Sequence, residues 1–173
     1  MATERYHAIY AYPYPLGDLR TPGRALDLPP ALQTLRHNKG MEAVAYANDG
    51  PLAGTLVVIS ERGQTFNADL PGFLLGGPTP GTFTVLRQDS YDATDAVFLD
   101  TGDLLLLERR FTLRHGIGMR VRLLPASELK PGALVVGRVL LEAGFSDQID
   151  NMEGIAVHRN AAGETILTII SDD

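Results

Sequence analysis

Acidic residues recur at matching places along the chain. Three segments each begin with a leading acid, followed by an apolar run, a polar turn and a second apolar run that ends in another acid. The leading acids are Glu42, Asp95 and Glu153, and Asn38 and Asn151 lie shortly before two of them. Carboxylate and amide oxygens are the ligands of hard cations. We therefore predict that these five residues bind a metal ion, with Ca²⁺ first and Mg²⁺ or Mn²⁺ second.

A structural role is open for the same acids. They can cap strands, or they can pair with arginines of a neighbouring segment. Both roles remain open for Glu42 and Glu153. The trailing acids Glu61, Glu108 and Asp172 are predicted to be structural or secondary acids. A salt bridge is favoured for the first two of them, because an arginine directly follows each.

Two arginines repeat in step with the trailing acids, namely Arg62 and Arg109. The planar guanidinium suits phosphate and carboxylate oxygens, so both are candidate phosphate or substrate contacts. Repeated Glu-Arg pairs can equally lock neighbouring segments together. We favour this second role for most arginines of the chain.

Several kinds of catalytic site are excluded by what the sequence lacks. The chain has no cysteine, which excludes a disulfide framework, a thiolate metal site and a cysteine nucleophile. No serine lies in a G-x-S-x-G nucleophile elbow. The histidines do not form a metal-binding pair, and a lone His158 is more typical of a packed or solvent-edge residue than of a base. Carboxylates and arginines therefore remain the chemically useful groups.

Strands must position these groups, because helical periodicity is scarce. Apolar runs of four to seven residues alternate with Gly, Pro, Asp and Asn, which is a strand-and-turn pattern. We predict an all-β fold with one short helix over 30–37. The predicted strands cover 42–47, 55–60, 72–76, 82–87, 95–99, 104–108, 117–124, 134–141, 153–158 and 165–171.

The repeating acid-strand-turn-strand-acid pattern favours a β-propeller over a β-sandwich. We predict about three four-stranded blade equivalents in one segment, 1–173. The outer strands of one blade fall in 4–29, full blades in 41–88 and 94–142, and the inner strands of a last blade in 152–173. Three blades are fewer than a closed propeller contains, so a homodimer or additional chain is expected to complete a six-bladed ring.

The composition of the chain argues against two kinds of partner, namely nucleic acid and a membrane. It has 173 residues, 15 Lys+Arg and 21 Asp+Glu, for a formal net charge of −6. An acidic balance argues against a nucleic-acid partner, which requires a basic face. No window approaches the roughly 18 apolar residues of a membrane span. The first residues lack the basic and apolar regions of a signal peptide.

Five phrases of the sequence carry a family resemblance. They are NKGMEAVA at 38–45, LLLLERRF at 104–111, GIGMRVR at 116–122, DNMEGIA at 150–156 and IISDD at 169–173. Together they resemble the family called esterase-like activity of phytase, a bacterial phytase-like propeller domain. The resemblance covers nearly the whole chain.

The resemblance implies ester or phosphoester hydrolysis that depends on Ca²⁺. On matching positions it assigns metal binding to Glu42, Asp95 and Glu153, and phosphate contacts to Arg62 and Arg109. It also implies a periplasmic or secreted protein, because family members are often exported. They are typically longer than this chain and continue beyond its Ser-Asp-Asp end.

Three functions are therefore compared. The first is a metal-dependent hydrolase in which Ca²⁺ neutralises phosphate charge and activates water, with Glu153 as general base. The second is a non-catalytic propeller that binds a ligand or a protein partner at the channel mouth. The third is an inactive fragment of a longer enzyme. The resemblance favours the hydrolase.

Overall fold

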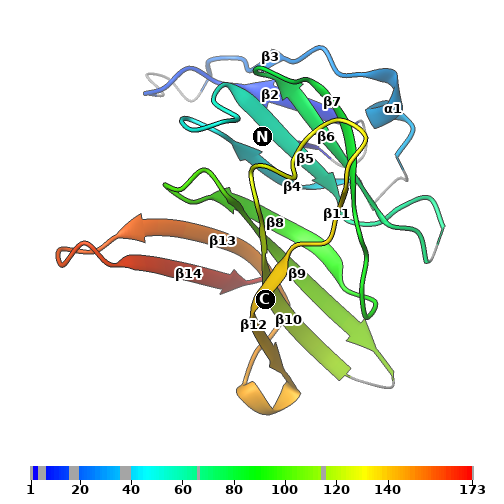
Figure 1. Cartoon of the computed structure of the whole chain (residues 1–173), viewed down its shortest axis with the longest axis vertical. Helices are drawn as coiled ribbons and strands as arrows, with labels where there is room; N and C mark the ends of the chain where they lie inside the picture. Colours follow the sequence, from blue (N-terminus) through cyan, green and yellow to red (C-terminus); the bar gives the residue numbers. More distant parts are fainter. Residues whose placement is uncertain are drawn as a thin grey trace.

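The computed structural model describes residues 2–3, 7–15, 20–35, 40–65, 67–113 and 116–172. Strands dominate it, and helix is almost absent, which confirms the all-β prediction. Figure 1 shows the sheets following one another in chain order, from the N-terminal segment at the top to the last hairpin at the lower left. Within these residues no helix has the length and hydrophobicity needed to cross a bilayer.

The N-terminal segment forms a small sheet and one helical turn. Its three antiparallel strands lie in the order β1-β2-β3. The elements are β1 (Ala2–Thr3), β2 (Ala8–Ala11), β3 (Arg24–Ala25) and α1 (Pro30–Gln33). The helix starts at a proline, which suits a first helical position. It ends earlier than the predicted 30–37, and residues 36–39 lie outside the described residues.

The next sheet has five strands in the order β11-β7-β6-β5-β4. Four of them are consecutive and antiparallel, whereas β11 joins parallel to β7 from much later in the chain. The strands are β4 (Met41–Tyr46), β5 (Thr55–Ser60), β6 (Leu70–Gly76), β7 (Gly81–Val85) and β11 (Leu134–Val135).

A four-stranded antiparallel sheet follows, in the order β12-β10-β9-β8, and a two-stranded hairpin ends the chain. The elements are β8 (Asp92–Phe98), β9 (Leu104–Thr112), β10 (Gly116–Leu124), β12 (Arg138–Gly144), the 3₁₀ turn η1 (Phe145–Asp147), β13 (Met152–Arg159) and β14 (Thr165–Ser171).

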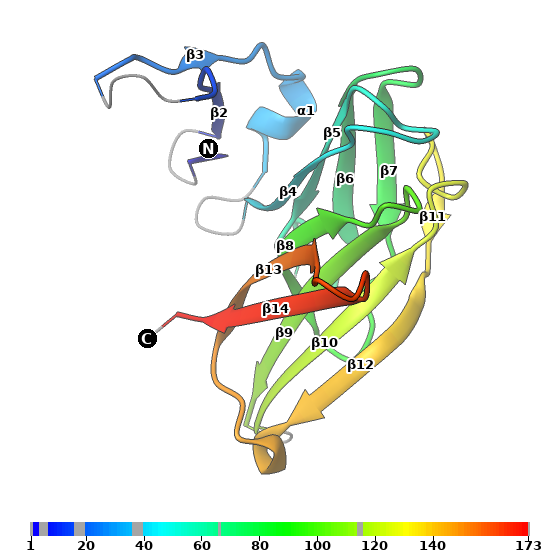
Figure 2. The same ribbon diagram turned by 90° about the vertical axis from the view of Figure 1, so that its left-hand side faces the viewer.

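Apolar side chains fill the space between successive sheets and hold them together. Figure 2 shows the ribbons of these sheets turned by 90° from the first view. The four leucines of β9 explain how the sheets are held together. Leu104 and Leu106 pack towards the five-stranded sheet, whereas Leu105 and Leu107 pack towards the terminal hairpin. Side chains alternate between the faces of a strand, so a continuous leucine run indicates a strand covered on both faces.

The prediction of one continuous strand over 134–141 is wrong. This run divides into β11 and β12. Gly137 adopts a positive φ of 68° between them, at the point where the chain leaves the edge of β7 and enters the four-stranded sheet. The other predicted strands, from 42–47 to 165–171, are confirmed with shifts of a few residues at their ends.

The first strands of the three later units lie side by side, with β8 in contact with both β4 and β13. Each carries an irregularity of register near its start, at Glu42, Thr94 and Glu153 respectively. An extra residue at such a bulge is left out of the ladder. By this register Thr94, and not Asp95, corresponds to the glutamates of the other two strands.

Candidate functional site

Four side chains meet where the five-stranded sheet, the four-stranded sheet and the terminal hairpin adjoin. We name them the Arg109 cluster, which consists of Glu61, Arg109, Asn151 and Glu153. Arg109 Nη1 lies 2.7 Å from Glu153 Oε1 and also donates to Asn151 Oδ1. Arg109 Nη2 lies 3.7 Å from Glu61 Oε1, and Asn151 Nδ2 donates to Glu153 Oε1 at 2.8 Å.

Backbone pairing explains why these residues meet. The Glu61 N–H donates to the Gly40 carbonyl, and the Glu61 carbonyl accepts from the N–H of Ala93, so this residue joins the five- and four-stranded sheets. The N–H of Asp172 donates to the Asn151 carbonyl in the same way at the terminal hairpin. Arg109, opposite Asp92 in the ladder, holds the corresponding place in the middle sheet.

The cluster is reachable from solvent on one side. The side chains of Arg109 and Glu153 are 30% and 29% exposed, whereas Glu61 is almost completely buried. Among the described residues, Glu153 Oε2 has no hydrogen-bond donor. The cluster therefore offers a fixed guanidinium and an adjacent carboxylate oxygen to an approaching molecule.

Asp95 lies elsewhere and makes a different set of contacts. Its Oδ1 accepts from the N–H of Ala96 and its Oδ2 from the N–H of Ile155, both at 2.8 Å. The second bond ties β8 to β13. Burial raises the pKa of Asp95, against the opposing effect of these two backbone hydrogen bonds.

The remaining predicted metal ligands do not complete a site. Glu42 is half-buried at the bulge of β4, and Asn38 lies outside the described residues. In the described ranges, no three acidic or histidine side chains lie close enough together to hold a metal ion. Both oxygens of Asp95, the Asn151 Oδ1 and the Glu153 Oε1 accept hydrogen bonds or ion pairs from groups of the protein itself. A calcium ion therefore does not fit the ligands that the structure describes.

Arg62, a predicted phosphate contact, is paired with Asp92. Its Nε donates to Asp92 Oδ1 at 2.9 Å, and its Nη2 binds the other oxygen. Arg87 binds the same carboxylate, with Nη2 2.8 Å from Oδ1. Hydrogen bonding to Asp92 raises the pKa of Arg62, although burial opposes the shift. The fork of this arginine is thus occupied by a neighbouring carboxylate.

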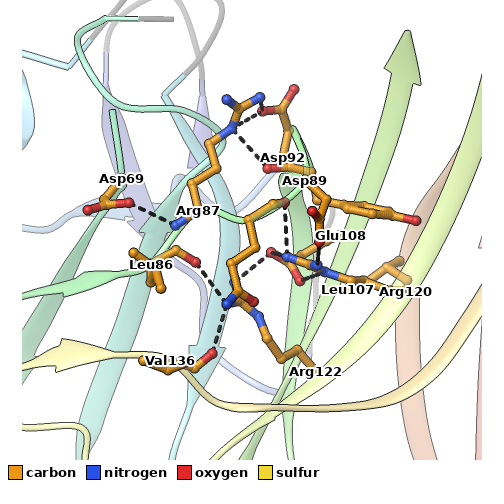
Figure 3. A network of polar contacts seen from close by, with 12 residues as sticks. Asp69, Leu86, Arg87, Asp89, Asp92, Leu107, Glu108, Arg120, Arg122 and Val136 are labelled. Carbon is orange, nitrogen blue, oxygen red and sulfur yellow. Dashed lines mark hydrogen bonds and ion pairs between the residues drawn. The ribbon is translucent and has the colours of Figure 1, made fainter. Parts of the chain in front are cut away.

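Glu108 lies in a buried network (Figure 3). Arg120 Nε lies 2.7 Å from Glu108 Oε2, and Arg122 Nη2 lies 2.6 Å from Oε1. Arg122 Nη1 also donates to the carbonyls of Leu86 and Val136, both at 2.8 Å. Burial lowers the pKa of Arg122, against the opposing charge of Glu108. Glu108 is therefore directed into the interior and away from the Arg109 cluster.

Sequence reasoning missed the two arginines that bind Glu108. The signal was present in the alternation of Arg120 and Arg122 along one strand, because residues two apart lie on the same face. Opposite Arg120 in the neighbouring strand stands Glu108. An acid facing two arginines across a ladder is recognisable once the strand register is known.

Tyr91 completes this network. The guanidiniums of Arg110 and Arg120 both lie over its ring, with their Cζ atoms 4.6 and 4.3 Å from the ring centre. Its hydroxyl donates to Glu142 Oε1 at 3.0 Å. Burial, followed by this hydrogen bond, raises the pKa of Tyr91 to about 12.

Two cavities lie at the opposite end of the first strands. One of about 420 Å³ lies between the ends of β4 and β8, and one of about 490 Å³ lies between the N-terminal segment and the five-stranded sheet. Tyr46 borders both of them. No member of the Arg109 cluster lines either cavity, so their residues and those of the cluster form separate sites.

Comparison with known proteins gives a single kind of match. The model of the phytase-like family, described as esterase-like activity of phytase, matches residues 1–173. This confirms the resemblance inferred from the sequence phrases. No curated protein and no solved structure matches the chain.

Proposed function

Because the chain belongs to the phytase-like family, we propose that it hydrolyses ester or phosphoester bonds at the Arg109 cluster. One observation carries the proposal. A guanidinium and a carboxylate from different sheets, Arg109 and Glu153, lie 2.7 Å apart and are both partly open to solvent. A fixed cationic donor can stabilise the negative charge of the transition state, and an adjacent carboxylate can accept the proton of the attacking water.

The two residues take complementary roles in this proposal. Arg109 binds the oxygen that carries negative charge in the transition state, at a carbonyl or a phosphoryl group. Glu153 Oε2 accepts a proton from the attacking water, whose oxygen bonds to the acyl carbon or to phosphorus. The ester bond then breaks, and the leaving alcohol takes up the proton. Asn151 holds Glu153 Oε1, so that Oε2 faces the substrate.

The proposal involves no metal step. Calcium dependence is what the family resemblance predicts, but the cluster oxygens already accept hydrogen bonds from Arg109 and Asn151. Glu42 and Asp95 do not join them. A hydrolase that uses this cluster therefore works through a guanidinium, and its activity is expected to be unchanged by chelation of divalent ions.

We also propose that the sheets are consecutive blades of a β-propeller. The adjacency of β4, β8 and β13, and the stacking of successive sheets, support this architecture. Other blades come from a second copy or from further chain. Light scattering tests the homodimer directly, since one chain has a mass of 18.7 kDa and a folded dimer has twice that mass.

Hydrolysis of p-nitrophenyl acetate and p-nitrophenyl phosphate tests the proposed activity. We expect Glu153→Gln to lower the rate roughly 10²- to 10⁴-fold, as loss of a general base does. Glu128→Gln is the matched control, because Glu128 is an exposed glutamate outside the cluster. Turnover equal in Glu153→Gln and the wild type would refute the proposal. Saturable binding of an ester without turnover would instead indicate the non-catalytic binding function.

A further inference from the structure

The oxygens around Arg109 are of the kind that hard cations select. Glu61, next to the five-stranded sheet, and Asn151 and Glu153, of the terminal hairpin, contribute two carboxylates and one amide oxygen. Such a set is a reasonable beginning of a calcium site by its chemistry alone. What fills the centre of the set is a side chain of the same protein, the guanidinium of Arg109.

The guanidinium of Arg109 and a calcium ion cannot bind these oxygens at the same time. Arg109 Nη1 lies 2.7 Å from Glu153 Oε1 and also binds Asn151 Oδ1. A calcium ion needs the same oxygens at about 2.3–2.6 Å. It could bind them only after the guanidinium had moved away, which would leave Glu61, almost completely buried, without its Arg109 partner.

Charge balance points the same way. Glu61 interacts electrostatically with Arg62 as well as with Arg109, and Arg62 in turn shares Asp92 with Arg87. Among the described residues, these ion pairs join three carboxylates and three guanidiniums. The six residues are Glu61, Asp92, Glu153, Arg62, Arg87 and Arg109. Although the chain carries a formal charge of −6, the charges of these six ion-paired residues cancel one another.

Position along the strands gives a third argument. Glu61 and Asp172 occupy equivalent places, each directly after a second strand and each paired to the residue before a first strand. Arg109 holds that place in the middle sheet. A basic residue thus stands where both neighbouring units have an acid.

We propose that Arg109 is the resident cation of this site and that its guanidinium excludes a divalent metal ion from the surrounding oxygens. The inference rests on the proposed function for the choice of site, and it deepens that function by stating which cation serves it. The substrate oxygen then meets a guanidinium, whose donors recognise an anionic oxygen in a plane.

Calcium titration by isothermal calorimetry on the full chain tests the proposal. Wild type and Arg109→Lys are expected to show no saturable binding in the range of roughly 10⁻⁴ to 10⁻³ M, where weak protein calcium sites bind. Arg109→Met removes the charge but keeps an apolar side chain of similar length. We expect its affinity for calcium to be at least about tenfold higher than that of the wild type. Arg159→Met is the matched control, because it removes the same charge from an exposed pair with Asp100.

Two results would overturn the proposal. One is wild-type calcium binding in that range that Glu153→Gln abolishes. The other is a folded Arg109→Met variant that binds calcium no more tightly than Arg159→Met. If Arg109→Met does not fold, the Arg109 Nε–H resonance of the wild type decides. A resonance unchanged by calcium supports the proposal, and one that shifts with saturation contradicts it. Loss of catalysis would change none of these readouts, so the two proposals can fail separately.

Discussion

Arg122 Nη2 donates to Glu108 Oε1 at 2.6 Å, and both side chains are completely buried. The same carboxylate also binds Arg120, so one buried carboxylate is the counter-ion of two buried guanidiniums. The arginines anchor further groups, since Arg122 reaches the carbonyls of Leu86 and Val136. This pair therefore connects the two segments that lead into β8 and into β12 of the four-stranded sheet.

Replacing Glu108 should destabilise the fold strongly. We expect Glu108→Gln to lower the free energy of unfolding by about 3–5 kcal/mol, because two buried cations lose their counter-charge. Arg122→Met should cost less, about 1–3 kcal/mol, since Glu108 keeps Arg120 and mainly two carbonyls lose a donor. Urea unfolding followed by circular dichroism measures both variants. Equal stabilities of Glu108→Gln and the wild type would contradict this account of the network.

Tyr91 should make stability depend on alkaline pH. The ordinary pKa of tyrosine is 10.0 and that of Tyr91 is raised to about 12. A group whose pKa is raised on folding contributes stability that is present below pH 10 and is lost as the pH rises towards 12. We expect Tyr91→Phe to lack this part of the decline. Unfolding of both proteins between pH 9 and pH 12 checks this, and parallel curves would disagree with it.

Asp95 should also make the stability of the fold depend on pH, in the acid range. Burial raises its pKa above the ordinary 3.8, so its contribution to stability is fully present below that value. The contribution is lost as the pH rises through the raised pKa. Asp95→Asn removes the titration, and the stability difference between variant and wild type should therefore change across this window. A difference independent of pH would show that burial does not govern this carboxyl.

Alanine substitutions at Gly137 and at Gly132 can be compared to distinguish the cost of backbone strain from the cost of steric overlap. Both Gly137 and Gly132 have positive φ, so an alanine at either place pays about 1–2 kcal/mol for the left-handed conformation. An added Cβ at Gly137 would also lie 2.5 Å from Leu124 Cδ2, whereas Gly132 has open space. Thermal unfolding should therefore rank Gly137→Ala below Gly132→Ala. The opposite order would mean that the β11–β12 turn can relax.

The strands were predictable because their apolar runs are short and bounded by turn residues. The run 104–107 is an example, since four consecutive leucines can be accommodated by a strand covered on both faces. The division at Gly137 was not predictable in the same way. It depends on β11 pairing with β7, a contact between residues far apart in the chain that no local pattern encodes.

The candidate site was predictable as a region but not as a set of contacts. Glu61, Arg109 and Glu153 were singled out by their repetition, and the structure brings them together. Asp95 was aligned with Glu153 by sequence, but the bulge at Thr94 places it one residue further along the ladder. A shift of one residue turns a side chain to the other face of a strand, which is why spacing alone could not identify the contacts.

The parallel pairing of β11 with β7 has a consequence for how such repeats can be exchanged. The segment that builds the four-stranded sheet also supplies the edge strand of the preceding sheet. A recombination event that replaced 92–144 as one unit would therefore leave a neighbour with a foreign border strand. An exchanged unit must therefore keep the pairing of β11 with β7 as well as its own internal contacts. These repeats are not independent modules, because the five-stranded sheet includes a strand from the next segment of the chain.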